Sequence, residues 1–220
     1  MTQHETKKEL KQVFDKIADE FSETRSYPWK TVEEFLEDRE GKTALDLACG
    51  NGRHLPHLSR NSDRVLGIDF SRKLLTDELH TDARNINIHL VCGDLNALPV
   101  ETSSVDLALF IAGLHHLPSR KNRIDALNEV ARVLRPQGNC LLSVWAIEHG
   151  RFDGVRDEIR DKNHDIYVPW NTSDGEKHNR YYHIYERNEF VDDIKESSLK
   201  LEKTWLDSGN YYAKTSGTKN

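Results

Sequence analysis

From about residue 41 onward, short apolar runs alternate with amphipathic segments. The runs expected to form strands are KTALDLAC (42–49), DRVLGIDF (63–70), NINIHLVC (85–92), SVDLALFIAG (104–113) and NCLLSVWA (139–146). The segments between them, GRHLPHLSR (52–60), SRKLLTDELH (71–80, with Ser71 as N-cap) and RKNRIDALNEVARVL (120–134), are expected to be helical. This alternation predicts an α/β fold, a doubly wound and mostly parallel sheet with helices on both faces.

Two segments lie outside the alternation. Residues 7–38 indicate two helices that are interrupted at SYPWK and cap the sheet. Residues 150–178 are charged and irregular, and we interpret them as an insertion before the helix NEFVDDIKESS (188–198) and closing strands. We therefore expect one domain, residues 1–220, that consists of a helical cap (1–40), a cofactor-binding core (41–147) and a substrate-side insertion with closing strands (148–220).

The composition narrows the class of protein only modestly. A chain of 220 residues can bury one core, and its net charge of -6 disfavours a protein that coats nucleic acid. Local basic runs at 7–11, 119–123 and 177–180 leave a basic patch open, although each is equally compatible with a solvated helix end. We find no run of 18 apolar residues and no apolar leader at the N-terminus, so the cytoplasm is the expected location.

The cysteines and histidines do not indicate a metal site. Cys49, Cys92 and Cys140 are odd in number and far apart in the sequence, so we expect buried thiols rather than disulfides or a zinc ribbon. His54 and His57 flank Pro56 on the first expected helix, and we interpret both as helix surface. No metal is expected.

The strongest local motif is LDLACGNGRHL (45–55), in which a strand enters a Gly-rich turn and a helix. Asp69 follows at the end of the next strand, where an acid can bind ribose hydroxyls. A tight turn that binds nothing is the alternative, and the position of Asp69 argues against it. NAD and S-adenosylmethionine sites share this layout. A dinucleotide fingerprint needs a small residue where this chain has Leu55, and this favours S-adenosylmethionine.

The pattern Asp46-x-Ala48-x-Gly50-x-Gly52 resembles motif I of the class I S-adenosylmethionine-dependent methyltransferases. GIDFS, CGDLNALPV, SVDLALFIAGLHHL and LNEVARVLRPQGNCLLSVW match later landmarks of that family in order. The resemblance covers residues 42–147 and implies a Rossmann-like, seven-stranded, mostly parallel sheet. It implies that S-adenosylmethionine is held by Asp46, Ala48, Gly50, Gly52, Asp69, Phe70, Asp94, Leu95 and Ile111.

Outside this core, FDKIADEFSETRSYPW (14–29), GLHHL (113–117), SVWAIE (143–148), RYYHIY (180–185) and DSGNYY (207–212) resemble the tRNA wobble-uridine carboxymethyl methyltransferases. These enzymes esterify the carboxylate of 5-carboxymethyluridine at position 34. The resemblance implies a tRNA anticodon loop as substrate. It also implies a small zinc-binding activator protein that pairs along the edge of the third strand (86–92) to form a heterodimer.

The implied reaction needs no general base, because a carboxylate is already ionised at pH 7. Arginines can recognise the anion, and aromatic faces can stack on an extruded pyrimidine. Of His115 and His116, we expect only one, His115, to face the pocket. Arg25 could instead pair with the cap helix, and the two tryptophans could be core residues. The candidate substrate-binding residues are Arg25, Trp29, His115, His116, Trp145, Arg180, Tyr181 and His183.

Two other functions share parts of this pattern. A small-molecule methyltransferase of the quinone or sterol type has the same core landmarks, but it has no use for the arginine-bearing segments ETRSYPW and RYYHIY together. A cofactor-binding partner subunit without catalytic activity is the second alternative. The intact Asp69, Asp94 and both turn glycines disfavour it.

Overall fold

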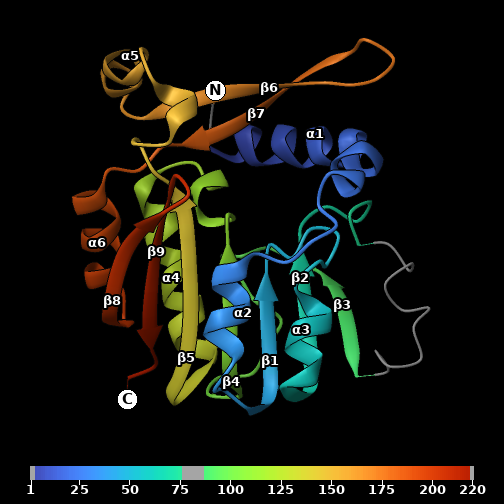
Figure 1. The fold of residues 1–220 in the computed structure, drawn as a ribbon, viewed down its shortest axis with the longest axis vertical. Coiled ribbons are helices and arrows are strands. Elements are labelled where there is room, and N and C mark those ends of the chain that lie inside the picture. Colours follow the sequence, from blue (N-terminus) through green and yellow to red (C-terminus); the bar gives the residue numbers. More distant parts are fainter. Residues whose placement is uncertain (1–2, 76–86, 219–220) are drawn as a thin grey trace.

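The computed structural model describes residues 3–75 and 87–218. Its main sheet contains seven strands in the order β3-β2-β1-β4-β5-β9-β8 (Figure 1). The bounds are β1 (Gly41–Leu47), β2 (Ser62–Asp69), β3 (Ile88–Cys92), β4 (Val105–Ile111), β5 (Leu134–Trp145), β8 (Lys200–Asp207) and β9 (Asn210–Ser216). Strand β9 is antiparallel to both of its neighbours, β5 and β8, and all other pairs in this sheet are parallel. The predicted fold class, a mostly parallel seven-stranded sheet, is therefore confirmed.

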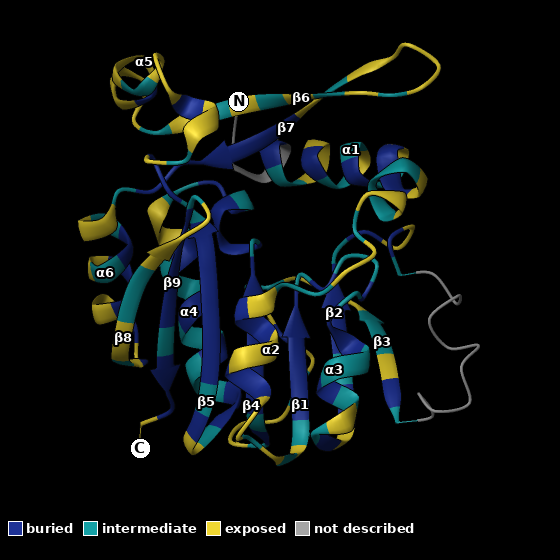
Figure 2. Cartoon of the chain, in the orientation of Figure 1, coloured by how far each residue is buried: buried dark blue, intermediate teal, exposed yellow. Residues whose placement is uncertain are grey.

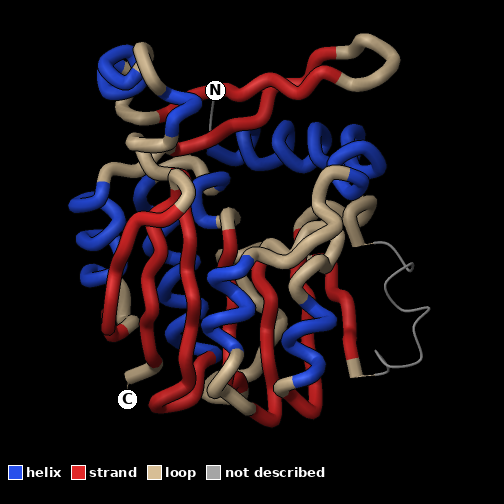
Figure 3. Tube along the Cα trace, in the orientation of Figure 1, coloured by secondary structure: helices blue, strands red, loops and turns tan. Residues whose placement is uncertain are grey.

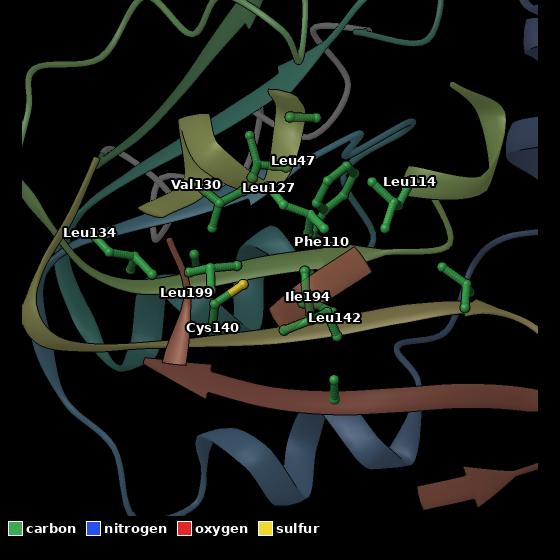
Figure 4. Packing of buried hydrophobic residues seen from close by; sticks show 14 of the residues in the cluster. Leu47, Phe110, Leu114, Leu127, Val130, Leu134, Cys140, Leu142, Ile194 and Leu199 are labelled. Atoms are coloured by element: carbon green, nitrogen blue, oxygen red, sulfur yellow. The ribbon is translucent and has the colours of Figure 1, made fainter. Parts of the chain in front are cut away.

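Helices cover both faces of the sheet because successive strand residues alternate in direction. On one face, α2 (Lys30–Leu36) and α3 (Leu55–Arg60) pack over Ala44 of β1. On the other face, α4 (Arg120–Val133) and α6 (Arg187–Glu196) pack over Leu45 and Leu47. Figure 4 shows this second cluster, in which Leu127 and Val130 of α4 meet the sheet side chains Phe110 and Leu142.

The cap lies at the carboxyl ends of the parallel strands. Helix α1 (Gln3–Glu23) crosses above these ends, and a separate two-stranded hairpin, β6 (Asp165–Asn171) and β7 (Lys177–His183), lies over it (Figures 1 and 3). Two helices form as predicted, separated by residues 24–29, but only α1 caps the strand ends, because α2 packs on a face of the sheet. This arrangement encloses the strand ends where the Gly-rich turn lies.

The interpretation of residues 150–178 as irregular is wrong. The segment contains η4 (Gly150–Phe152), α5 (Arg156–Asp161), β6 and the start of β7. Residues Ile166, Val168 and Trp170 are half-buried, while the residues between them are exposed (Figure 2). This alternation is the signal of a one-sided strand, and the charged residues around it obscured it.

Two of the three cysteines and the N-cap serine lie as the sequence predicts. Cys49 and Cys140 are buried as expected, whereas Cys92 is exposed because it ends the edge strand β3. Ser71 makes the hydrogen bond expected of an N-cap, because its hydroxyl accepts from the Leu74 N–H at 3.3 Å. Residues 76–80 of the predicted second helix and residues 85–86 of the predicted third strand lie outside the described residues.

Among the described helices, none combines the length and the apolar character that a bilayer span requires.

Candidate active site

A cavity of about 260 Å³ lies at the carboxyl ends of β1, β2 and β4, beneath α1. A second cavity of about 490 Å³ lies beside it, beneath the N-terminal turns of α1. Both cavities are lined by Ala48, Phe70 and His116, so they are two compartments of one site.

The Gly-rich turn forms the floor where the compartments meet. Ala48, Gly50 and Gly52 have φ values of 54°, 56° and 78°, which is the left-handed region that glycine tolerates best. Asp69 fixes this turn to the end of β2, because its carboxylate accepts hydrogen bonds from the Gly50 N–H at 2.9 Å and the Ser71 N–H at 2.8 Å. Burial nevertheless raises the pKa of Asp69 to about 6.

Asp46 is the main orphaned acceptor on this floor. Its side chain is buried, and its Oδ2 has no hydrogen-bond partner among the described residues. Burial raises the pKa of Asp46 to about 8, against the opposing influence of the nearby Arg53. A buried carboxyl group with a free oxygen that lines a cavity is suited to a ligand that brings a positive charge.

The expected cofactor residues are distributed between the two compartments. Asp46, Ala48, Gly50, Asp69, Phe70 and Ile111 line the smaller cavity, and Asp94 and Leu95 line the larger one. Gly52 lines neither cavity; its N–H donates to the Cys49 carbonyl at 2.8 Å and closes the turn. Asp94 also receives Lys7 of α1, whose Nζ lies 3.2 Å from its carboxylate.

Five of the expected substrate residues line the smaller cavity: Arg25, Trp29, His115, His116 and Trp145. Arg25 forms no ion pair with any described residue, so it does not pair with the cap helix as the alternative supposed. Trp29 and Trp145 are only half-buried and lie in the cavity wall. These three side chains are therefore available to a ligand.

The expectation that only one of the two adjacent histidines faces the pocket is wrong. Their rings pack edge to face at 4.7 Å, and both line the cavity. The Trp145 N–H donates to His115 Nδ1 at 3.0 Å, and His116 Nδ1 donates to the Tyr181 carbonyl at 3.0 Å. Burial lowers both pKa values, that of His116 to about 4, so both rings are neutral at pH 7.

Strand β7 does not bring all of its expected residues to the cavity. Tyr182 lines the cavity, whereas Arg180 does not line it and lies over the Tyr182 ring, with Cζ 5.5 Å from the ring centroid. Tyr181 and His183 point the other way, toward Asp165, at 2.7 Å and 2.8 Å. The structure therefore replaces Tyr181 and His183 with Tyr182 in the cavity wall.

His54 is a second residue that the sequence analysis placed incorrectly. It is buried in the cavity wall, and neither ring nitrogen has a partner among the described residues. Burial lowers the pKa of His54 to about 3. Its position immediately before α3, next to the Gly-rich turn, is the signal that could have placed it at the site. Arg53 also lines the cavity, with Cζ 5.0 Å from the Trp29 ring centroid.

The basic run at 119–123 is engaged in ion pairs within the described part of the chain. Arg120 and Arg123 pair with Asp193, Arg123 also pairs with Glu189, and Lys121 pairs with Asp125. The pairs made by Arg120 and Arg123 join α4 to α6, whereas the Lys121 pair lies within α4. Free cations must therefore be sought elsewhere on the molecule.

Comparison with known proteins identifies the class. A methyltransferase domain model matches residues 45–142. The fold matches the methyltransferase in a complex with the Haloferax volcanii Trm112 methyltransferase activator (TM-score 0.70, 18% identity, 96% of this chain and 98% of that one). It also matches an S-adenosylmethionine-dependent methyltransferase from Listeria monocytogenes (TM-score 0.68, 17% identity, 87% and 98%). A protein of Encephalitozoon cuniculi that is named as a methyltransferase is 31% identical over 86% of this chain and 85% of its own length. From these matches, the chain belongs to the class I S-adenosylmethionine-dependent methyltransferases.

Within this class, several relatives are tRNA (carboxymethyluridine(34)-5-O)-methyltransferases. The mouse ALKBH8 protein is 39% identical over 64% of this chain, and the Saccharomyces cerevisiae protein is 35% identical over 72%. The chain spans 20% of the mouse protein and 54% of the yeast protein. The Schizosaccharomyces pombe protein is 28% identical over 91% of this chain and 92% of its own length.

The residues present fit S-adenosylmethionine, the cofactor of this class. Asp46 offers a buried, unpartnered carboxylate oxygen for an ammonium group, and Asp69 lies beside the turn at the end of β2. The larger compartment combines apolar walls with the Asp94 carboxyl group. A cofactor with both an amino acid and a nucleoside part can therefore occupy both compartments.

Proposed function

We propose that this chain is a tRNA methyltransferase that esterifies the carboxylate of 5-carboxymethyluridine at wobble position 34. The observation that carries the proposal is the pair Arg25 and Arg180. Neither guanidinium forms an ion pair with a described residue. Arg25 lines the cavity and lies over Phe21, and Arg180 lies over Tyr182, whose ring lines the cavity. Such a site suits an anionic group on a flat heterocycle. The names of the relatives support the same substrate.

The site is suited to a reaction that needs no general base. When bound, S-adenosylmethionine supplies an electrophilic methyl group. A substrate carboxylate is already ionised, so it would accept this methyl group without losing a proton, and the chain's own residues would have to hold it beside the cofactor. His115 and His116 are neutral at pH 7 and hold fixed positions through backbone hydrogen bonds. Their role is to shape the wall, and the site contributes mainly by orienting the carboxylate.

Cofactor contacts are assigned by compartment. Asp46 receives the ammonium group of the methionine part, and Asp69 receives the ribose hydroxyls. Asp94 and Leu95 receive the adenine in the larger cavity, where Lys7 must share or release the Asp94 carboxylate. Phe70 and Ile111 supply apolar contacts.

A zinc-binding activator protein is the proposed partner, in a cytoplasmic heterodimer. Strand β3 forms one edge of the main sheet, and its Leu90 and Val91 are only partly buried. An apolar edge of this kind favours pairing with another chain. The Haloferax volcanii structural neighbour forms a complex with the Trm112 activator. Expression of the chain alone should yield poorly soluble or weakly cofactor-binding protein, and co-expression with the host's small zinc-binding activator should correct this.

A substrate comparison tests the proposed function. Matched anticodon stem–loops that carry uridine or 5-carboxymethyluridine at position 34 are incubated with the chain, its activator and methyl-labelled cofactor. Label should enter only the modified stem–loop. Transfer to small acids or quinones instead would establish the small-molecule alternative, and cofactor binding without transfer to any substrate would indicate a catalytically silent subunit.

A further inference from the structure

A ladder of interleaved arginine and aromatic side chains passes along one wall of the smaller cavity, which Trp145, Tyr182 and Arg25 line. It consists of Arg151, Trp145, Tyr182, Arg180, Trp170 and Arg25. Arg151 Cζ lies 4.5 Å from the Trp145 ring centroid, and Tyr182 stacks on Trp145 at 4.3 Å. Arg180 Cζ lies 5.5 Å from Tyr182 and 4.9 Å from Trp170, and Arg25 Cζ lies 5.7 Å from Trp170.

Nearby acids do not neutralise Arg151. Asp153 pairs with Arg156 at 2.7 Å, and the Glu148 carboxylate accepts the Tyr211 hydroxyl. No described residue forms an ion pair with Arg151, and the residue is exposed. Its guanidinium is held by stacking on Trp145 and remains available to an anion from solvent.

The three arginines of the ladder carry more positive charge than one substrate carboxylate needs. A single guanidinium can hold a carboxylate through two parallel hydrogen bonds. Arg180 is buried at the inner part of the ladder and Arg25 lines the cavity, so these two are placed for the carboxylate. Neither Arg151 nor Arg180 lines the cavity, but Arg180 is buried whereas Arg151 is exposed and stacks on Trp145. The exposed guanidinium of Arg151 therefore suits a second anionic group that approaches from solvent.

We infer that Arg151, positioned by Trp145, binds a backbone phosphate of the single-stranded RNA next to the methylated nucleotide. The inference rests on the proposed function and extends it to the substrate contacts outside the cavity. A nucleotide whose base enters the cavity leaves its phosphates at the rim. Cations interleaved with aromatic faces are the usual platform for single-stranded nucleic acid. The basic residues at 119–123 have carboxylate partners, whereas Arg151 has no ion-pair partner among the described residues.

The test measures binding of a short unmodified RNA of anticodon-loop sequence by fluorescence anisotropy across a salt series. It uses the full chain with its activator. Arg151→Gln should lower affinity about fivefold at low salt and make the slope of log Kobs against log salt shallower by about 0.7, the value for one phosphate contact on a single strand. Arg151→Lys should keep the slope. Arg160→Gln, a matched change at an arginine that already pairs with Glu186 and Asp157, should behave as wild type.

Two results would overturn the inference. One is wild-type affinity in Arg151→Gln; the other is weaker binding with an unchanged salt slope, which indicates lost packing rather than a lost phosphate contact. The proposed function is judged separately by methyl transfer to the modified stem–loop. If the stem–loop is methylated and Arg151→Gln binds RNA like wild type, the proposed function holds and the phosphate contact is wrong. If Arg151→Gln weakens RNA binding with a shallower salt slope but the stem–loop is not methylated, the phosphate contact holds and the proposed function is wrong.

Discussion

Tyr181 and Tyr182 are neighbours on β7, and their side chains point to opposite faces of the strand. The Tyr181 hydroxyl donates to Asp165 at 2.7 Å, outside the cavity. The Tyr182 ring stacks on Trp145 within the cavity wall, with the two planes only 10° apart. Of the two hydroxyl groups, that of Tyr182 is therefore the one available to a substrate.

A pair of Tyr→Phe changes tests this division. Tyr182→Phe keeps the stack and removes a hydroxyl that has no protein partner among the described residues, so stability should stay within about 0.5 kcal/mol of wild type while kcat/KM falls roughly tenfold. Tyr181→Phe loses a hydrogen bond to a half-exposed carboxylate and should cost about 1 kcal/mol of unfolding free energy, with little effect on kcat/KM. Urea unfolding and stem–loop kinetics measure both quantities. The reverse pattern would place Tyr181, and not Tyr182, at the substrate.

His183 joins the hairpin β6–β7 to α6. Its two ring nitrogens lie 2.8 Å from Asp165 and 2.8 Å from Glu189, and Arg123 of α4 also faces Glu189. Burial alone would lower the pKa of His183, but the two carboxylate hydrogen bonds outweigh it and raise the pKa above its ordinary value of 6.5. The imidazolium form is therefore favoured in the folded protein.

The sign of the pH dependence follows from this raised pKa. The stabilisation by His183 is fully present below pH 6.5, its unfolded value, and is lost as the pH rises through the higher folded value. His183→Gln should cost about 2 kcal/mol near pH 6 and clearly less in alkaline buffer. Urea midpoints of both proteins across this pH range measure the difference. Parallel stability curves for the two proteins would show that His183 is not charged in the fold.

Asp46 gives a prediction for cofactor binding. Because the folded-state pKa of Asp46 is raised to about 8, its carboxyl group carries a proton at pH 7. Binding of the cofactor's ammonium group favours the ionised form, so binding should release a proton and affinity should rise with pH toward about 8. Calorimetry in two buffers of different ionisation enthalpy measures the release. Asp46→Asn should bind more weakly without releasing a proton; a proton release equal to that of wild type would assign it to another group.

Arg180 separates substrate binding from cofactor binding. Arg180→Ala should reduce methyl transfer by about a hundredfold or more, since a charge-assisted contact to the carboxylate is lost. Cofactor affinity should remain near the wild-type value, because Arg180 lines neither of the two compartments assigned to the cofactor. Equilibrium dialysis and the melting temperature provide the controls. Lost cofactor binding in a folded variant would show that Arg180 supports the fold of the site rather than the substrate.

The sequence determined the core of the fold well, because each buried strand is a distinct apolar run. The turn from Ala48 to Gly52 could be located because its positive φ values favour glycine, and two glycines stand there. Asp69 could be located because it ends the next apolar run. The hairpin β6–β7 was missed, because its alternation is shallow and its exposed positions are charged or polar.

The choice between Tyr181 and Tyr182 depends on strand register, which sequence alone does not fix. A shift of one residue moves every side chain of a strand to the opposite face, so the residues of RYYHIY could be assigned to the site as a group but not to its two sides. The surface position predicted for His54 was wrong for a different reason. Its ring packs against Trp29, which comes from a segment distant in sequence, with the ring centroids 6.5 Å apart.

The most direct measurement of the central claim is the identity of the product. Transfer RNA that carries 5-carboxymethyluridine is incubated with the chain, its activator and S-adenosylmethionine, digested to nucleosides and analysed by mass spectrometry before and after mild alkali. The account predicts one added methyl group at position 34 that alkali removes, as expected of an ester. An added methyl group that survives alkali, or one that also appears on tRNA without the carboxymethyl group, would contradict it.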